Sequence, residues 1–200
     1  MGFGRTIAGL TIAGVLLAGC AAVPGLGPGA LDTYQLTITP PPAKGRRLSR
    51  TQVLVAEPSA IKALDSQSIV IKPGPGMIEY LSGAQWADRL PKVVQASLVE
   101  GFQLSGRLGG VGKPGEGLAI DYQVITEIRS FEIRVDGAAR AEIDLNVRIL
   151  NDRNGVVRAT RSFSASIPVA GKGNDAFIEA LNAGFDQVAG EIVTWSLRAM

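Results

Sequence analysis

The stretch that decides the fold is ARAEIDLNVRI, from Ala139 to Ile149. Apolar side chains occupy every second position, and Arg, Glu, Asp and Asn occupy the positions between them. Successive side chains of a strand point to opposite faces of a sheet. The pattern therefore predicts an antiparallel strand with one face buried and the other polar.

The residues before this strand predict a partner strand with one irregularity. Apolar residues alternate from Ile120 to Ile128 and resume at Phe131 on the opposite parity. This phase change predicts a β-bulge or a bend near Arg129 and Ser130. Asp136-Gly137 is a turn signal between the two strands.

The residues after this strand predict a third strand, beyond a turn at 151–155. Arg161 interrupts its inward-facing series, so we expect it either near a sheet edge or in a polar contact. The residues expected to point inward are Val157, Ala159, Phe163, Ala165 and Ile167.

Two segments carry apolar residues along one face of a helix. The first covers about 86–104; Pro91 places its regular start near Leu90, with 84–89 in a looser turn. Asn174 or Asp175 is the expected N-cap of the second. The stripes are Trp86, Leu90, Val93, Val94, Leu98 and Phe102, and then Phe177, Leu181, Phe185, Val188, Ile192 and Trp195.

Shorter strands are predicted ahead of the first helix. Tyr34, Leu36 and Ile38 share one face of a short strand, and the segments 68–72 and 77–81 form a natural hairpin. Together the patterns predict an α+β fold: a single mixed, largely antiparallel sheet with two long helices packed on one face. Trp86 is expected in the core, with a partner-binding role as the alternative.

The N-terminal residues have the layout of a secretory leader. Arg5 precedes an apolar run from Ile7 to Leu17, which is too short to span a bilayer. Leu17-Ala18-Gly19-Cys20 then resembles a lipobox, the cleavage site after which the cysteine is acylated. Cys20 is the only cysteine of the chain, so an internal disulfide is impossible and lipid attachment is the predicted role.

These features divide the chain into three parts. Residues 1–19 are the predicted lipoprotein signal peptide, 20–32 a flexible Gly- and Pro-containing tether, and 33–200 a single α+β domain. Fully extended, the tether segment 21–31 reaches at most about 35 Å, so the domain is expected close to the lipid surface.

Composition argues against several classes of function. The chain has 20 Lys and Arg residues against 18 Asp and Glu residues, which gives no support for nucleic-acid binding. It has no histidine, so a His-dependent catalytic triad is impossible. We expect no catalytic residues, no cofactor and no metal site.

Two local patterns have a functional and a simpler interpretation. The basic cluster Lys44, Arg46, Arg47 and Arg50 is expected in a loop, as a solvated linker or as a site attracted to anionic lipid headgroups. The glycines of Gly110-x-Gly112-x-x-Gly115 fit a dinucleotide fingerprint, but they follow a predicted helix and lead into a strand. No helix N-terminus that could hold a pyrophosphate is therefore expected after these glycines.

Read together, these segments resemble the ABC-type transport auxiliary lipoprotein family. The match spans nearly the whole chain and consists, beyond the lipobox, mostly of hydrophobic positions. Lys72 stands where the family often has an arginine. The residues that carry the resemblance are Cys20, Tyr34, Leu36, Val53, Val55, Pro58, Leu64, Asp65, Ile69, Val70, Tyr80, Trp86, Ala87, Leu90 and Trp195.

The resemblance implies a non-enzymatic lipoprotein of the cell envelope. It would face the periplasm and act as the auxiliary, docking component of an ABC/MCE-type system that moves lipids or other hydrophobic solutes between membranes. Its implied partners are an MCE-domain protein, ABC transporter subunits and the membrane itself. Ala21, after the lipidated Cys20, is permissive for sorting to the outer membrane.

Three other interpretations stay open at this point. The protein could carry lipid in its own apolar cavity of a few hundred Å³, or be a structural envelope lipoprotein. Glu142 and Asp144 could form the carboxylate pair of an enzyme such as a glycosidase, although solvated charge is the ordinary explanation on the polar face of a strand. Open sheet edges make a homo-oligomer possible.

Overall fold

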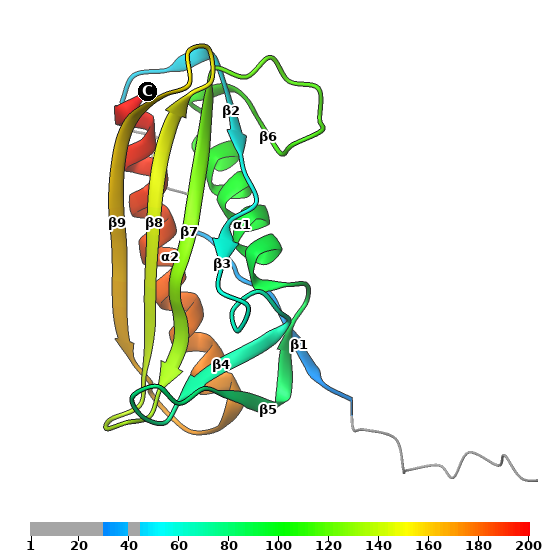
Figure 1. Ribbon diagram of the computed structural model, residues 1–200, viewed down its shortest axis with the longest axis vertical. Helices are drawn as coiled ribbons and strands as arrows, with labels where there is room; N and C mark the ends of the chain where they lie inside the picture. The colour runs from blue at the N-terminus through cyan, green and yellow to red at the C-terminus, as the bar shows by residue number, and fades with distance from the viewer. Residues whose placement is uncertain (1–29, 40–44) are drawn as a thin grey trace, which may run out of the picture. The chain divides into compact units, whose positions relative to one another are not determined.

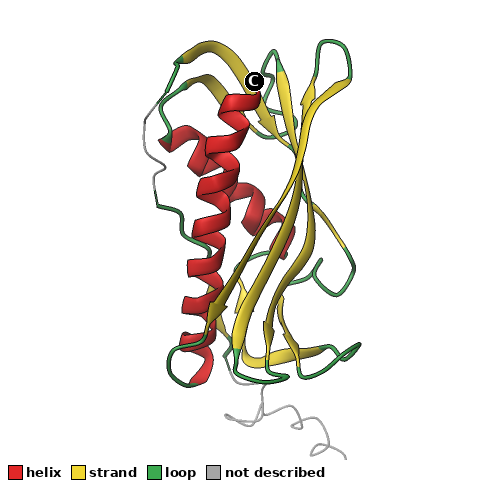
Figure 2. Cartoon of the chain, turned by 90° about the vertical axis from the view of Figure 1, so that its left-hand side faces the viewer, coloured by secondary structure: helices red, strands yellow, loops and turns green. Residues whose placement is uncertain are grey.

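The structure is a computed structural model that describes residues 30–39 and 45–200. Within those ranges the chain forms one open, mixed sheet with two helices on one of its faces, as Figures 1 and 2 show. The predicted α+β fold is confirmed. The elements are β1 (Asp32–Tyr34), β2 (Leu48–Val55), β3 (Ser59–Ala60), β4 (Ser68–Lys72), β5 (Glu79–Trp86), α1 (Leu90–Leu104), β6 (Leu108–Gly112), β7 (Tyr122–Arg134), β8 (Arg140–Asn151), β9 (Val156–Pro168) and α2 (Gly173–Ala199).

The long strand β7 organises the sheet because it pairs along both of its edges. One edge forms an antiparallel ladder with β8, which pairs in the same way with β9. The other edge pairs in parallel with three short strands in turn: β2 near Tyr122, β3 near Glu127 and β4 near Glu132. From there β6 extends the sheet beyond β2, while β5 and then β1 extend it beyond β4.

The bulge predicted in β7 is confirmed. The pairing of β7 with β8 shifts register between Ile128 and Ser130, so Arg129 is the extra residue. A bulge of one residue reverses which parity faces the core. Ile128 is therefore buried on the helix side before the bulge, and Phe131 and Ile133 after it.

The core fills the space between the helices and the sheet. Phe131 contacts Trp86 edge-on, with ring centroids 5.8 Å apart, and Phe185 of α2 with centroids 6.0 Å apart. Trp86 is only 1% exposed, so its predicted place in the core is confirmed. Gly184 lets α2 approach β8 closely, since a Cβ there would lie 3.1 Å from Ile143 Cδ1.

Two predictions near the helix starts are wrong. Residues 84–86 end strand β5 instead of forming a looser turn, although α1 does begin at Leu90 as expected. Neither Asn174 nor Asp175 caps α2, whose N-cap Lys172 makes no side-chain cap bond. Instead Asn174 Nδ2 donates to the Ser82 carbonyl, and Asp175 accepts a hydrogen bond from the Tyr34 hydroxyl.

The last strand differs from its prediction at one end. A register shift between Ile149 and Leu150 sets Val157 opposite Leu150, on the face away from the helices, where it is 45% exposed. Arg161 lies on β9, which pairs only with β8 among the described strands. Its guanidinium lies 4.7 Å from the ring centre of Phe163 and 3.9 Å from the carboxylate of Glu191 in α2. Arg161 therefore lies at a sheet edge and also makes a polar contact, the two explanations that the sequence left open.

A close backbone approach between β2 and β6 gives a test of this packing. A Cβ on Gly109 would lie 2.4 Å from the Ser49 backbone oxygen, whereas at Gly110 the nearest atom, Gln52 Cγ, would be 3.6 Å away. We expect Gly109→Ala to lower the free energy of unfolding by about 1–3 kcal/mol. Its matched control, Gly110→Ala, is expected to change it by less than about 0.5 kcal/mol. Equal effects in urea unfolding would contradict the described approach.

Candidate functional site

The predicted lipidation residue, Cys20, lies outside the described residues. The described chain leads away from that region through residues 31–39, which we call the N-terminal strap. Leu31 at its start is 48% exposed, and Asp32 already pairs with Ala84 of β5. The strap is the covalent connection between the folded body and the predicted anchor, so its contacts decide how firmly the two are joined.

Beyond β1 the strap lies along α2 instead of pairing with another strand. The Thr37 N–H and hydroxyl bond Asn182 Oδ1 at 2.8 and 3.1 Å. The Thr39 N–H and hydroxyl donate to the two oxygens of the Asp186 carboxylate, at 2.5 and 2.8 Å. With the bond from the Tyr34 hydroxyl to Asp175 at 2.8 Å, these contacts form three rungs.

The spacing of the rungs follows from the rise of the two structures. An extended chain advances about 3.3 Å per residue, and a helix about 1.5 Å. From Tyr34 to Thr39 the strap therefore covers roughly 16 Å. From Asp175 to Asp186 the helix also covers roughly 16 Å. The strap and α2 run in the same direction and cover equal lengths between rungs. Each of the three strap residues therefore lies beside its hydrogen-bond partner on α2.

The other side of the strap packs on α1. Leu36 is buried, and its carbonyl accepts a hydrogen bond from Ser97 Oγ at 3.4 Å. Ile38 reaches Gly101, where a Cβ would lie 2.5 Å from Ile38 Cδ1 and 3.3 Å from Val193 Cγ2 of α2. The strap thus lies between the two helices, and its predicted apolar face (Tyr34, Leu36 and Ile38) is confirmed even though only Tyr34 belongs to a strand.

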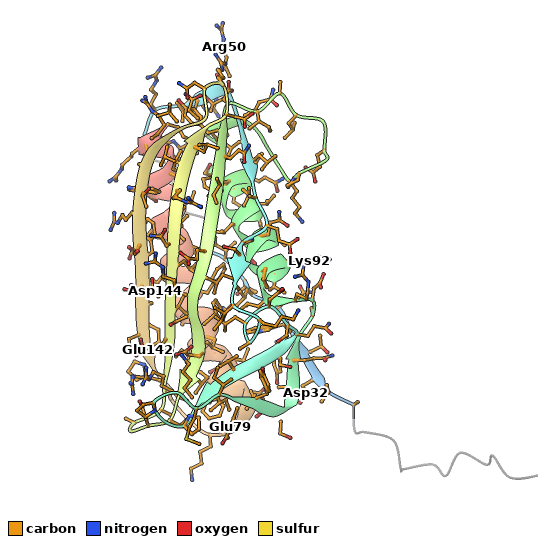
Figure 3. All side chains as sticks on the ribbon, viewed as in Figure 1. Asp32, Arg50, Glu79, Lys92, Glu142 and Asp144 are labelled. Atoms are coloured by element: carbon orange, nitrogen blue, oxygen red, sulfur yellow. The ribbon has the colours of Figure 1, made fainter. Side chains whose placement is uncertain are left out.

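A groove of about 480 Å³ runs between the strap and the outer side of α1. It opens to solvent, and its lining includes four charged side chains: Asp88, Lys92, Glu100 and Lys113. Figure 3 shows Lys92 projecting from the lower part of α1. Apolar residues such as Leu36 and Val93 line the groove as well, so its opening to solvent is what distinguishes it from the enclosed apolar cavity that a lipid carrier would need.

The two carboxylates considered for catalysis lie on the sheet face away from the helices, as Figure 3 shows. Glu142 accepts hydrogen bonds from Arg140 Nε and Ser166 Oγ, each at 2.8 Å. These contacts make Glu142 part of a surface ion-pair group with Arg140 and Asp136. The arrangement supports the structural explanation of the pair.

The glycine-rich segment and the basic cluster are placed as follows. Gly110 and Gly112 lie in β6, and the chain continues through a loop to β7, so no helix N-terminus follows them. Lys44 lies outside the described residues. Arg46 and Arg47 precede β2, but Arg50 belongs to it, so the cluster is not confined to a loop.

Two further observations concern only the part of the chain that the structure describes. No helix there is both long and apolar enough to cross a bilayer. No group of three or more Cys, Asp or Glu side chains there is arranged to hold a metal ion.

The strap contacts were not foreseen from the sequence. Asn182 and Asp186 occupy the polar side of an amphipathic helix, where solvation is the usual explanation. The available signal was their spacing of four residues, which matches the spacing of two between Thr37 and Thr39 in an extended chain.

Comparisons with known proteins agree with this architecture. The model of a family described as the ABC-type transport auxiliary lipoprotein component matches residues 34–193. A protein of Bradyrhizobium diazoefficiens is 31% identical over 189 residues, covering 92% of this chain and 50% of its own length. The chain thus spans about half the length of that relative.

Solved structures show the same fold. The crystal structure of a Xanthomonas campestris protein is similar with a TM-score of 0.76 and 29% identity, covering 85% of this chain and 95% of that one. A Chlamydia trachomatis protein is similar in fold alone, with a TM-score of 0.50 and 12% identity over 72% of this chain and 94% of that one.

Removing one rung tests the attachment of the strap. Asp186→Ala deletes the acceptor of two hydrogen bonds from Thr39, and we expect a loss of about 1–2 kcal/mol in the free energy of unfolding. Amide hydrogen exchange at Thr37 and Thr39 should accelerate, because the strap opens locally. The control is Glu179→Ala on an exposed position of the same helix. Unchanged exchange at Thr39 in Asp186→Ala would show that the rung does not hold the strap.

The rung at Tyr34 has a pH signature. The hydrogen bond donated to Asp175 raises the pKa of Tyr34 from its ordinary value of 10.0 to about 12. The neutral phenol is thus favoured in the folded state, and its contribution is complete below pH 10 and lost as pH rises toward 12. The stability difference between the wild type and Tyr34→Phe, from urea unfolding, should be constant up to about pH 9.5 and then shrink. A difference that persists undiminished at pH 11.5 would refute it.

Proposed function

Because this chain belongs to the family of ABC-type transport auxiliary lipoproteins, we propose that it is the membrane-anchored docking component of an intermembrane transport system. Its cargo would be lipids or other hydrophobic molecules, and its partners an ABC transporter and an MCE-domain protein. The family is one of transport auxiliaries and not of enzymes. The chain would face the periplasm from its lipid anchor at Cys20, and Ala21 is permissive for an outer-membrane location.

The attachment of the strap carries this proposal. A docking subunit must keep its partner-binding surfaces near the membrane, so only a short free segment can separate the anchor from the body. Here Leu36 is buried between the helices, and Thr37 and Thr39 are bonded to α2. A carrier that shuttles lipid would need an enclosed apolar cavity instead, and the observed groove is open with charged lining residues.

Co-purification from native membranes tests the proposal. The full-length wild-type protein, crosslinked in its own cells and solubilised, should bring down the ATPase, permease and MCE-domain subunits, and should sediment with outer-membrane fractions. Cys20→Ser cannot be acylated through a thiol, so it should leave the membrane fraction and lose these partners.

Other outcomes discriminate the alternatives. Co-purified lipid without transporter subunits would favour the lipid-carrying alternative, and neither lipid nor partners would favour a structural envelope lipoprotein. Cys20→Ser remaining in the membrane fraction would argue against the lipid anchor. Ala21→Ser is the matched control, because it changes the neighbouring residue and keeps the cysteine.

A further inference from the structure

The body has two ends that the helix α2 separates. At one end the Tyr34 hydroxyl bonds Asp175 in the first turn of α2, close to where the strap begins. At the other end the Tyr122 hydroxyl donates to the Met200 carbonyl, just past the last turn. Since α2 has 27 residues, the two ends lie about 40 Å apart. We call the second one the distal end; it is uppermost in Figure 1.

The start of β2, the start of β9 and the end of α2 all lie at the distal end, and each carries arginine. Three of these arginines lie just before β2 or in its first residues. One lies near the start of β9, and one lies in the last turn of α2. All are exposed, and none forms an ion pair with an acid of the described residues. This distal arginine cluster consists of Arg46, Arg47, Arg50, Arg158 and Arg198.

The nearby acids are already engaged. Asp121 accepts the Gln52 N–H and the Arg153 guanidinium, each at 2.9 Å, and these bonds hold the pKa of its carboxyl below the ordinary value. Asp152 accepts a hydrogen bond from Gln123. Among the described residues, Asp121 pairs with Arg153, and neither Asp121 nor Asp152 forms an ion pair with an arginine of the cluster. In a chain with 20 basic and 18 acidic side chains overall, this is a local concentration of positive charge.

The fold holds this part of the cluster in place. The buried Arg107 donates from Nε and Nη2 to the Arg46 carbonyl, at 3.0 and 2.8 Å. Gly45 fits beside it with φ of 118°, where a Cβ would lie 2.9 Å from Arg107 Nη2. The turn that presents Arg46 and Arg47 is thus fixed from beneath.

A bulge directs Arg50 outward. The pairing of β2 with β6 shifts register between Leu48 and Gln52, so the residues around Arg50 leave the regular ladder. Bulges commonly redirect a side chain in this way. Figure 3 shows Arg50 projecting from the distal end, away from the body.

We infer that the distal arginine cluster is a docking site for an acidic protein surface, one rich in Asp and Glu side chains. Arginine suits this role, because its planar guanidinium binds carboxylates through two parallel hydrogen bonds. The inference rests on the proposed function and deepens it, since it assigns that function a partner-binding surface.

The position of the cluster favours a protein partner over the anchoring membrane. Residues 20–30 can extend at most about 36 Å, less than the roughly 40 Å between the two ends of the body. If Cys20 carries the anchor, an upright body resting on its distal end would hold its strap end farther from the bilayer than this segment reaches.

A binding assay with a fluorescent polyglutamate peptide tests the inference on the full-length lipoprotein in detergent. The cluster variant carries Arg46→Gln, Arg47→Gln and Arg50→Gln, and should bind the peptide about tenfold more weakly in fluorescence polarisation. Wild-type affinity should also fall steeply with added salt, because the pairs are exposed. The assay needs no transport subunit, so its outcome is separate from that of the co-purification.

A matched control removes the same number of charges elsewhere. Lys62→Gln, Arg129→Gln and Lys172→Gln change exposed basic residues outside the cluster and should leave peptide affinity within about twofold of wild type. Equal losses in both triple variants, or no loss in the cluster variant, would overturn the inference.

A third arm uses the lipoprotein in phosphatidylcholine vesicles mixed with free phosphatidylglycerol vesicles. Clustering of the two populations that the cluster variant abolishes would overturn it too, because the arginines would then bind a second membrane.

Discussion

Burial of one face of β8 beneath α2 is the contact on which the rest of the body depends. Ile143, Leu145 and Val147 are buried there, against a helix that approaches closely at Gly184. Once one side of α2 is packed on the sheet, its remaining sides can contact other segments of the chain. One side receives the strap through Asn182 and Asp186, and its two ends mark the strap end and the distal end of the body.

Regular periodicity made most of this architecture predictable. The alternation in β8, the phase change at Arg129 and the two helical stripes each have one simple physical explanation, and the structure confirms them except at Trp86, which belongs to β5 and not to α1. What failed depended on partners distant in sequence. Asp175 has the chemistry of an N-cap, yet Tyr34 lies within reach and takes its carboxylate. Val157 follows the strand alternation, but a register shift against Leu150 moves it to the other face.

The proposed docking surface was less predictable than the core because it is made of polar residues without periodicity. The basic residues before β2 were visible, but not that Arg158 and Arg198 lie at the same end of the body. Their meeting follows from the topology, in which β2 and β9 begin where α2 ends. Glu142 and Asp144 show the reverse, since a spacing compatible with catalysis belongs to the polar face of a strand, where Arg140 and Ser166 engage Glu142.

The matched rise of the strap and α2 also has a mechanical meaning. Tension applied at Leu31 along the axis of α2 loads the strap lengthwise, because the strap runs parallel to α2 from its first turn. All three rungs then bear the force in shear, together with the burial of Leu36, and they must break at nearly the same time. If the strap crossed the helix instead, the same tension would load its hydrogen bonds one at a time, and a much smaller force would break them in sequence. The geometry thus suits a body that must stay attached to its N-terminal segment under load.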